Sequence, residues 1–300
     1  MHAADASAEP SADGRIIAPR FQVHAYGRVP RILGAVLQVL LVADLLSLSL
    51  LIVFDTFTGA LNPTPPAQAG WLALLALVLF GLLQILRWFS AATFLVEPER
   101  LVLERRGDRF EIPLSSVVSI QPWRLPLPGA GLSLRMKSGR TFQYSPQVSD
   151  PLPLLEALGR HNPELSATAR PSLTAFAHAR AMIVRQRWYH LAFKFVLFPL
   201  LPAGIMFRAN QYITYGGPFG QYQMYGLGPY LQSLGTYWTF FTAVLVLLAV
   251  LLRVPSELIA FIGAWLSPPH ARGVRRFVEV ANAVLYYVGF PAFMAARFFL

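Results

Sequence analysis

The sequence predicts a polytopic α-helical membrane protein of about five spans, with a small cytoplasmic β domain inserted between the second and third spans. Two observations place it in the membrane class: 55% of the 300 residues are hydrophobic and 13% are charged. An average soluble domain is about 25% charged. The third observation is that apolar runs give way to alternating apolar and polar residues over residues 91–165, which is typical of half-buried strands.

The N-terminal part of the chain predicts a tail followed by a transmembrane hairpin. Residues 1–31 are small, polar and proline-containing, so we expect a partly disordered cytoplasmic tail. The apolar run at residues 32–54 is long enough, at about 1.5 Å per residue, to cover the roughly 30 Å hydrocarbon core. It is too long for the apolar region of a signal peptide, so we predict a retained span. A proline-rich turn and a second span at residues 71–89 complete the hairpin, residues 32–90.

The predicted β domain, residues 91–165, begins with two hairpins. In "RFEIPLSSVVSI" the residues Phe110, Ile112 and Leu114 fall on one face of an extended chain. "GLSLRMKSGRTFQYS" predicts a second hairpin that turns at "KSG", and "DPLPLLEALGRH" predicts a short closing helix. Residues 166–187 then form a basic amphipathic linker.

The segment "FLVEPERLVLERRGDRFEIPLSSVVSIQPW" and the later "GLSLRMKSGRTFQY" hairpin together resemble the bacterial pleckstrin-homology-like domains of small multi-span membrane proteins. The resemblance covers residues 91–160, about a quarter of the chain. It implies a partly open β barrel with a C-terminal helix, joined to membrane helices. It implies no catalytic residue, because this fold serves mostly as a scaffold for binding.

The C-terminal transmembrane region, residues 188–300, predicts spans at residues 188–207, 237–252 and 277–300. Residues 254–266 are too short to cross alone, and they either extend the fourth span beyond Pro255 or lie in the membrane interface. The last span contains Glu279 and Pro291, which leaves open whether it crosses the bilayer fully.

The distribution of basic residues predicts the topology. Fourteen of the 25 lysines and arginines lie between Arg87 and Arg187, whereas the two loops on the other side carry none and one, Arg208. The positive-inside rule therefore places the N-terminus and the β domain in the cytoplasm, with the protein in a bacterial inner membrane. The net charge of +10 also suits nucleic-acid binding, but topology signals and headgroup contacts explain it better. We therefore predict no nucleic-acid partner.

The connection between the third and fourth spans, residues 208–236, is predicted to be an outer loop rich in tyrosine and glycine. Tyrosine is enriched at interaction hot spots, so its aromatic residues are candidates for a partner-binding face. The alternative is a loop that packs on itself at the membrane interface. The candidate residues are Tyr212, Tyr215, Phe219, Tyr222, Tyr225 and Tyr230.

Three polar residues fall inside predicted spans. Asp44 lies near the middle of the first span, where a charge costs about 2.5–3.5 kcal/mol on insertion scales. It joins a proton path or pairs with His190, Lys194 or a partner subunit; alternatively, it is neutral and hydrogen-bonded. His190 is a candidate axial ligand for a metal or pigment. No second ligand stands at a useful spacing, so we predict no metal and no cofactor, and leave contact with a pigment or haem open.

Basic and aromatic residues flank the inner ends of the spans. Anionic headgroups attract such clusters with about 1 kcal/mol per basic residue, so we expect anionic lipids as partners and bound structural lipids. The predicted headgroup contacts are Arg180, Arg185, Arg187, Trp188, Arg272, Arg275 and Arg276.

No Ser/His/Asp order, carboxylate pair or nucleotide-binding fingerprint is visible. The predicted function is therefore a non-enzymatic accessory or scaffolding subunit of a larger respiratory, photosynthetic or transport complex, with other membrane subunits as partners. One rival is a small transporter or channel in which Asp44, Lys194 and Glu279 face one cavity. A second rival is a lipid-modifying membrane enzyme that uses His190 or Asp44.

Overall fold

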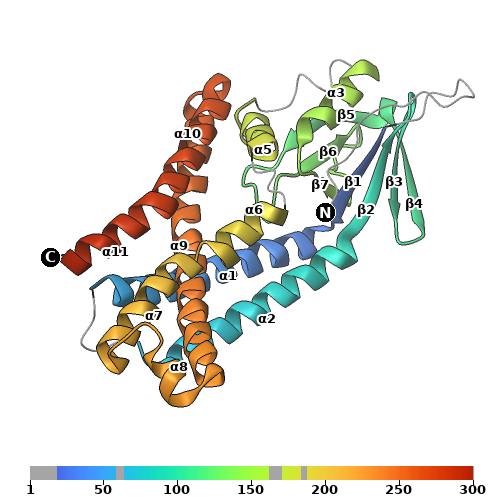
Figure 1. Ribbon diagram of the computed structural model, residues 1–300. Helices are drawn as coiled ribbons and strands as arrows, with labels where there is room; N and C mark the ends of the chain where they lie inside the picture. Colours follow the sequence, from blue (N-terminus) through green and yellow to red (C-terminus); the bar gives the residue numbers. More distant parts are fainter. Residues whose placement is uncertain (1–18, 59–63, 162–170, 184–187, 300) are drawn as a thin grey trace, which may run out of the picture. The chain divides into compact units, whose positions relative to one another are not determined.

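The computed structural model describes residues 19–58, 64–161, 171–183 and 188–299. The chain divides into two compact units (Figure 1). The first unit takes residues 1–42, 75–184 and 259–276, and the second takes residues 43–74, 185–258 and 277–300.

Within the described residues, five helical segments are long and apolar enough to cross a membrane, as predicted. They are Arg28–Thr56, Pro66–Ser90, Trp188–Tyr215, Leu227–Leu266 and Pro268–Ala296. The fourth, α9 (Leu227–Leu266), is continuous for 40 residues with Pro255 inside it, so residues 254–266 extend this helix. The fifth segment joins η3 (Pro268–His270), α10 (Ala271–Val284), η4 (Leu285–Gly289) and α11 (Phe290–Phe299).

The first unit contains a curled antiparallel sheet that forms a half-barrel. Five strands pair in the order β4-β3-β2-β1-β7, and β5 pairs with β6. A bridge between Gly131 and Gln147 connects the end of β6 to β7. After β1, the strands are β2 (Ala91–Val96), β3 (Arg100–Arg105), β4 (Asp108–Pro113), β5 (Val117–Pro122), β6 (Leu132–Met136) and β7 (Ser145–Gln147). The short η1 (Leu114–Ser116) separates β4 from β5.

Strand β1 (Arg20–Tyr26) comes from the predicted N-terminal tail, which differs from the sequence prediction. It pairs with β2 so that Phe21 lies opposite Phe94 and Val23 opposite Ala92, and Figure 1 shows the two strands side by side. Phe21 and Val23 are buried in the domain core. Residues 1–18 of the predicted tail lie outside the described residues.

The helical hairpin is therefore inserted between the first two strands of the sheet. Strand β1 leads into α1 (Arg28–Thr58), and α2 (Pro66–Ser90) leads directly into β2. The strand pairing is antiparallel, so the two helices act as the long connection of a β hairpin. The sequence prediction had this relationship reversed, with the β domain as the insertion.

The closing helix α3 (Pro151–His161) is present as predicted. It buries Leu154, Leu155 and Leu158 against the sheet core. The predicted basic linker contains α5 (Pro171–Ile183), whose residues Phe176 and Ala179 pack with alanines of α9 and α10. The helix α5 therefore packs against α9 and α10. The rest of the linker lies outside the described residues.

Gly34 lets the connection between β5 and β6 approach α1 closely. A Cβ atom at Gly34 would lie 3.1 Å from Leu86 Cδ2 and 3.3 Å from Pro128 Cγ. One helical turn earlier, the guanidinium of Arg31 lies 3.9 Å from the ring centroid of Trp123. The connection thus packs on the first turns of α1, and this contact requires a residue without a side chain at position 34.

The core of the second unit draws on four helical segments. Its buried residues come from α1 (Leu48 and Val53), α7 (Ala203), the middle of α9, and the η4–α11 segment (Tyr286 and Phe290). The remaining helices of this unit are α6 (Trp188–Ala192), η2 (Phe193–Leu197), α7 (Leu200–Tyr215) and α8 (Gly220–Tyr225).

Candidate functional site

The segment predicted as an outer loop, residues 208–236, is helical in the structure. It comprises the end of α7, the short helix α8 and the start of α9 (Figure 1). Gly216 ends α7 with φ +74°, and its N–H donates to the carbonyl oxygen of Tyr212. Gly226 ends α8 with φ +81° and an extended ψ of −176°, and its N–H donates to the carbonyl oxygen of Tyr222. These two glycines of the segment have the positive φ that favours glycine, and α8 forms between them. We call residues 208–236 the aromatic cap.

Two buried glutamines hold the aromatic cap together. Gln211 Nε2 donates to Gln221 Oε1 at 2.7 Å, and the backbone N–H of Gln221 donates to Gln211 Oε1 at 3.2 Å. Gln221 Nε2 also donates to Ser233 Oγ at 2.8 Å. These bonds connect α7, α8 and α9 and satisfy polar groups that are removed from water. The cap is therefore a built structure with a defined shape.

The six predicted partner-binding residues separate into partly buried and exposed positions. Tyr230 is partly buried, with ring centroids 4.9 Å from Phe207, 6.2 Å from Phe219 and 6.3 Å from Tyr222. Tyr215 is partly buried and packs on Tyr225. The exposed aromatic residues of the cap are Tyr212, Phe219, Tyr222 and Tyr225.

A second group of polar residues joins α9 to α10. Arg253 donates to Glu257 and to Glu279, with N–O distances of 2.6 Å for both pairs. Asn282 donates to the hydroxyl of Ser256, which in turn donates to the backbone carbonyl of Leu252. All these side chains are partly or fully buried. The sequence prediction missed Arg253 and Glu257, although an Arg/Glu pair four residues apart inside an apolar helix was a visible signal.

Lys194 lies near this group, in one of two π-helical turns that contact each other. Its ammonium is 4.5 Å from the ring centroid of Tyr286, and the Tyr286 hydroxyl donates to the Lys194 carbonyl oxygen at 3.2 Å. Lys194 belongs to η2 and Tyr286 to η4, both π-helical. Such turns are rare and occur frequently at functional sites. Lys194 is also within electrostatic range of Arg253 and Glu279. We call Lys194, Arg253, Glu257, Glu279 and Tyr286 the charged cluster.

Among the described residues, Asp44 makes no hydrogen bond or ion pair with this cluster. Its side chain is 8% exposed, and neither carboxylate oxygen has a hydrogen-bond partner among the described residues. The predicted pairing with His190 or Lys194 is therefore absent from the described part of the chain. His190 instead lies against the ring of Tyr189, with centroids 4.4 Å apart. The sequence left this pairing open as one alternative, because it does not contain the direction in which each helix face points.

The predicted headgroup residues occupy different environments. Arg272 donates from Nη2 to His178 Nε2 at 2.6 Å, and His178 Nδ1 donates to the Asp150 carboxylate at 2.9 Å. Arg275 is 1% exposed, which differs from the predicted headgroup contact. It shares a helix face with the buried residue Ala271, four positions earlier.

The other headgroup candidates lie closer to the surface. Arg276 and Trp188 are exposed, and Arg180 is half-buried. Arg185 and Arg187 lie outside the described residues.

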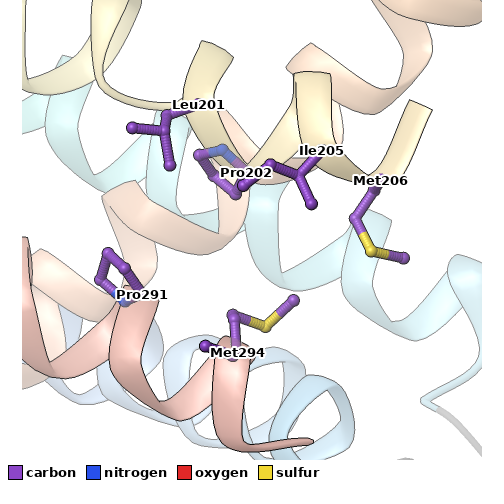
Figure 2. A pocket seen from close by; sticks show the side chains of 7 residues that line it. Leu201, Pro202, Ile205, Met206, Pro291 and Met294 are labelled. Atoms are coloured by element: carbon purple, nitrogen blue, oxygen red, sulfur yellow. The ribbon is translucent and has the colours of Figure 1, made fainter. Parts of the chain in front are cut away.

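An apolar groove lies between α7 and α11. Its volume is about 260 Å³, and all seven residues that line it are apolar. Figure 2 shows Pro202, Ile205 and Met206 of α7 above Pro291 and Met294 of α11. Leu201 and Ala295 complete the lining.

Among the described residues, no group of three or more His, Asp or Glu side chains is placed to hold a metal ion. Comparison of the chain with protein-family models, curated proteins and solved structures gave no match.

Proposed function

We propose that this protein is a non-enzymatic accessory or scaffolding subunit of a larger complex in a bacterial inner membrane. In this proposal the five apolar helices cross the bilayer, and the half-barrel is a cytoplasmic pleckstrin-homology-like domain. The aromatic cap lies on the outer side, where it binds another membrane subunit. Anionic lipids contact the basic residues at the inner side.

The aromatic cap is the observation that carries the proposal. It is internally braced by Gln211 and Gln221, and it still exposes four aromatic side chains. Ile213 and Met224 are also exposed, at 85% and 65%. A rigid surface rich in exposed aromatic and apolar groups is typical of a protein interface, because little conformational entropy is lost when a partner binds.

The order of contacts along the helices supports the proposed topology. Positive-inside orientation requires the third and fifth apolar helices to run in the same direction. Residues 193–198 contact Tyr286 and Tyr287, whereas residues 201–206 share a groove with residues 291–295. Later residues of the third segment therefore meet later residues of the fifth, as expected for helices that run in parallel.

A small transporter or channel is the second candidate function. The charged cluster favours it, because Lys194 and Glu279 were predicted to share one site and do lie near each other. Charged groups inside apolar helices mark ion and substrate pathways by default. The lack of a hydrogen bond between Asp44 and these two residues, within the described part of the chain, weighs against this candidate, since the predicted pathway needs all three residues in one cavity.

The test is the native mass of the protein after extraction from its own membranes in mild detergent. We expect a stoichiometric complex for the wild type, and its loss in the double variant Tyr222→Ser, Tyr225→Ser. Tyr189→Ser, an exposed tyrosine on α6, is the matched control and retains the complex. A monomeric wild type, or a complex that survives the double variant, contradicts the proposal. A monomer that transports ions in vesicles and loses this activity in Glu279→Gln supports the transporter instead.

A further inference from the structure

The strongest unassigned feature of the second unit is a row of side chains, which we call the seam, with a cation at one end and an apolar groove at the other. Lys194 lies at the first end, above the ring of Tyr286. The rings of Phe198 and Tyr287 follow, 4.9 Å apart. The groove between α7 and α11 begins at Leu201, seven residues after Lys194. The seam is therefore amphipathic along its length.

We propose that this seam binds one membrane phospholipid, with the phosphate at Lys194 and an acyl chain in the α7–α11 groove. The inference rests on the membrane insertion in the proposed function. It adds a specific lipid site that is separate from the predicted headgroup contacts.

The length of the seam matches one leaflet of a bilayer. From Lys194 to Ile205 the helix advances by eleven residues, which is about 16 Å. The hydrocarbon core of a bilayer is roughly 30 Å thick, so one leaflet contributes about half of that. A phosphate at Lys194 would thus place the acyl chain along the seam, with its end in the groove.

The chemistry of the groove selects an acyl chain. The lining side chains present only carbon and thioether sulfur. Water needs two to four polar partners in such a space, and the groove offers none from its side chains. In an empty groove, the lining side chains would lack dispersion contacts on their exposed side. The two methionines, Met206 and Met294, adapt their shape to a flexible chain.

Lys194 is available for a phosphate. Within the described part of the chain its ammonium makes no ion pair and lies over the rings of Tyr286 and Phe195. Glu279 is within electrostatic range of Lys194, and its carboxylate binds Arg253. Lys194 also lies six residues after the exposed Trp188, about 9 Å along the helix. A lysine at this depth reaches the headgroup level through its flexible stem.

The experiment measures lipid binding by native mass spectrometry of the full chain in detergent, after delipidation and addition of a defined phosphatidylglycerol. We expect one bound phospholipid for the wild type and at least a five-fold lower bound fraction for Lys194→Met and for Ile205→Trp, which fills the groove. Lys137→Met removes a cation from the β domain, and Ile259→Trp places the same ring on an exposed position of α9. Both controls bind as the wild type does.

A diacylglycerol with the same chains tests the phosphate. We expect it to bind the wild type several-fold more weakly than the phospholipid, and to bind Lys194→Met as it binds the wild type. Equal binding of the two lipids by the wild type overturns the role of Lys194. Unchanged phospholipid binding by Ile205→Trp overturns the role of the groove.

A second measurement needs no variant. A phospholipid with a photoreactive group in its acyl chain should label the wild type within residues 199–208 or 290–296. Labelling confined to other helices, or of a second copy of the chain or a partner seated in the groove, contradicts the proposal. Neither measurement requires a partner subunit, so failure of the lipid site and failure of the proposed scaffolding role are distinguishable.

Discussion

Arg253 binds Glu279 across 26 residues of sequence, with 2.6 Å between Nη1 and Oε1. The same guanidinium binds Glu257, one turn later on its own helix. One cation thus connects α9 to α10 and binds two carboxylates inside apolar helices. Lys194 lies within electrostatic range of Arg253 and Glu279 and adds a second positive charge to the cluster. The position of α10 on α9 therefore depends on a small number of strong contacts.

Arg253→Met should destabilise the protein by about 2–4 kcal/mol, because it leaves two partly buried carboxylates without their cation. Glu279→Gln keeps a hydrogen-bond acceptor and should cost about 1–2 kcal/mol. The exchange variant Arg253→Glu, Glu279→Arg should recover most of the loss. Thermal unfolding in detergent measures all three. Arg253→Met at wild-type stability would show that the ion pairs do not hold these helices together.

Tyr230→Ala should destabilise the aromatic cap by about 1–3 kcal/mol, because its partly buried ring packs against Phe207, Phe219 and Tyr222. Tyr225→Ala removes an exposed ring and should change stability by less than about 1 kcal/mol. Hydrogen exchange of the cap amides measures the local effect. Equal protection in the two variants would contradict the division into partly buried and exposed tyrosines.

Gly34→Leu should lower stability by about 1–3 kcal/mol, since the new side chain collides with Leu86 and Pro128. Gly81→Leu is the matched control on α2, because nothing lies within 4 Å of a Cβ atom there. A helix gains from replacing glycine, so the control should be neutral or slightly stabilising. Midpoints of thermal unfolding give the comparison. Similar midpoints for the two variants would argue against close packing at Gly34.

His24 should make the stability of the half-barrel dependent on pH. Burial lowers the pKa of His24 below 6.5, opposed by its hydrogen bond to the Arg87 carbonyl and assisted by the Arg87 charge. Below pH 6.5 the unfolded chain therefore binds more protons than the folded one, until the folded pKa is reached. The free energy of unfolding should fall as the pH is lowered through this window, and His24 should contribute nothing above it.

The measurement is the unfolding midpoint of wild type and His24→Gln between about pH 5 and 7.5. The variant should have a shallower dependence on pH, because glutamine does not titrate. His161→Gln, an exposed histidine on α3, should retain the wild-type dependence. Identical slopes for wild type and His24→Gln would exclude His24 as the source.

Local patterns in the sequence were sufficient for most of the helices and strands. Long apolar runs predicted all five apolar helices, because hydropathy is summed over many residues and tolerates single exceptions such as Glu279. Alternation predicted β2 to β6, and the spacing of leucines predicted α3. The predicted boundaries of the elements were less accurate. Residues 208–236 were predicted to be a loop, because a composition rich in tyrosine and glycine does not by itself distinguish helices that end at glycine from turns.

Pairings between distant segments were not predictable in this way. Strand β1 is seven residues long and gains its stability from β2 and β7, which lie on the far side of two helices in the sequence. The same holds for Gln211 with Gln221 and for Arg253 with Glu279. Each is an ordinary polar residue until the fold places its partner within hydrogen-bond distance.

Composition and periodicity by themselves determined that this chain forms five apolar helices and a small β domain, because those properties depend on neighbouring residues. Only the tertiary structure decided that strand β1 completes the sheet and that the side-chain amides of Gln211 and Gln221 hold the aromatic cap together. The same is true of the position of Lys194, at the opposite end of the seam from the α7–α11 groove. These features depend on contacts between residues that are not neighbours in the sequence. Such contacts stabilise the fold strongly only when packing removes both partners from water.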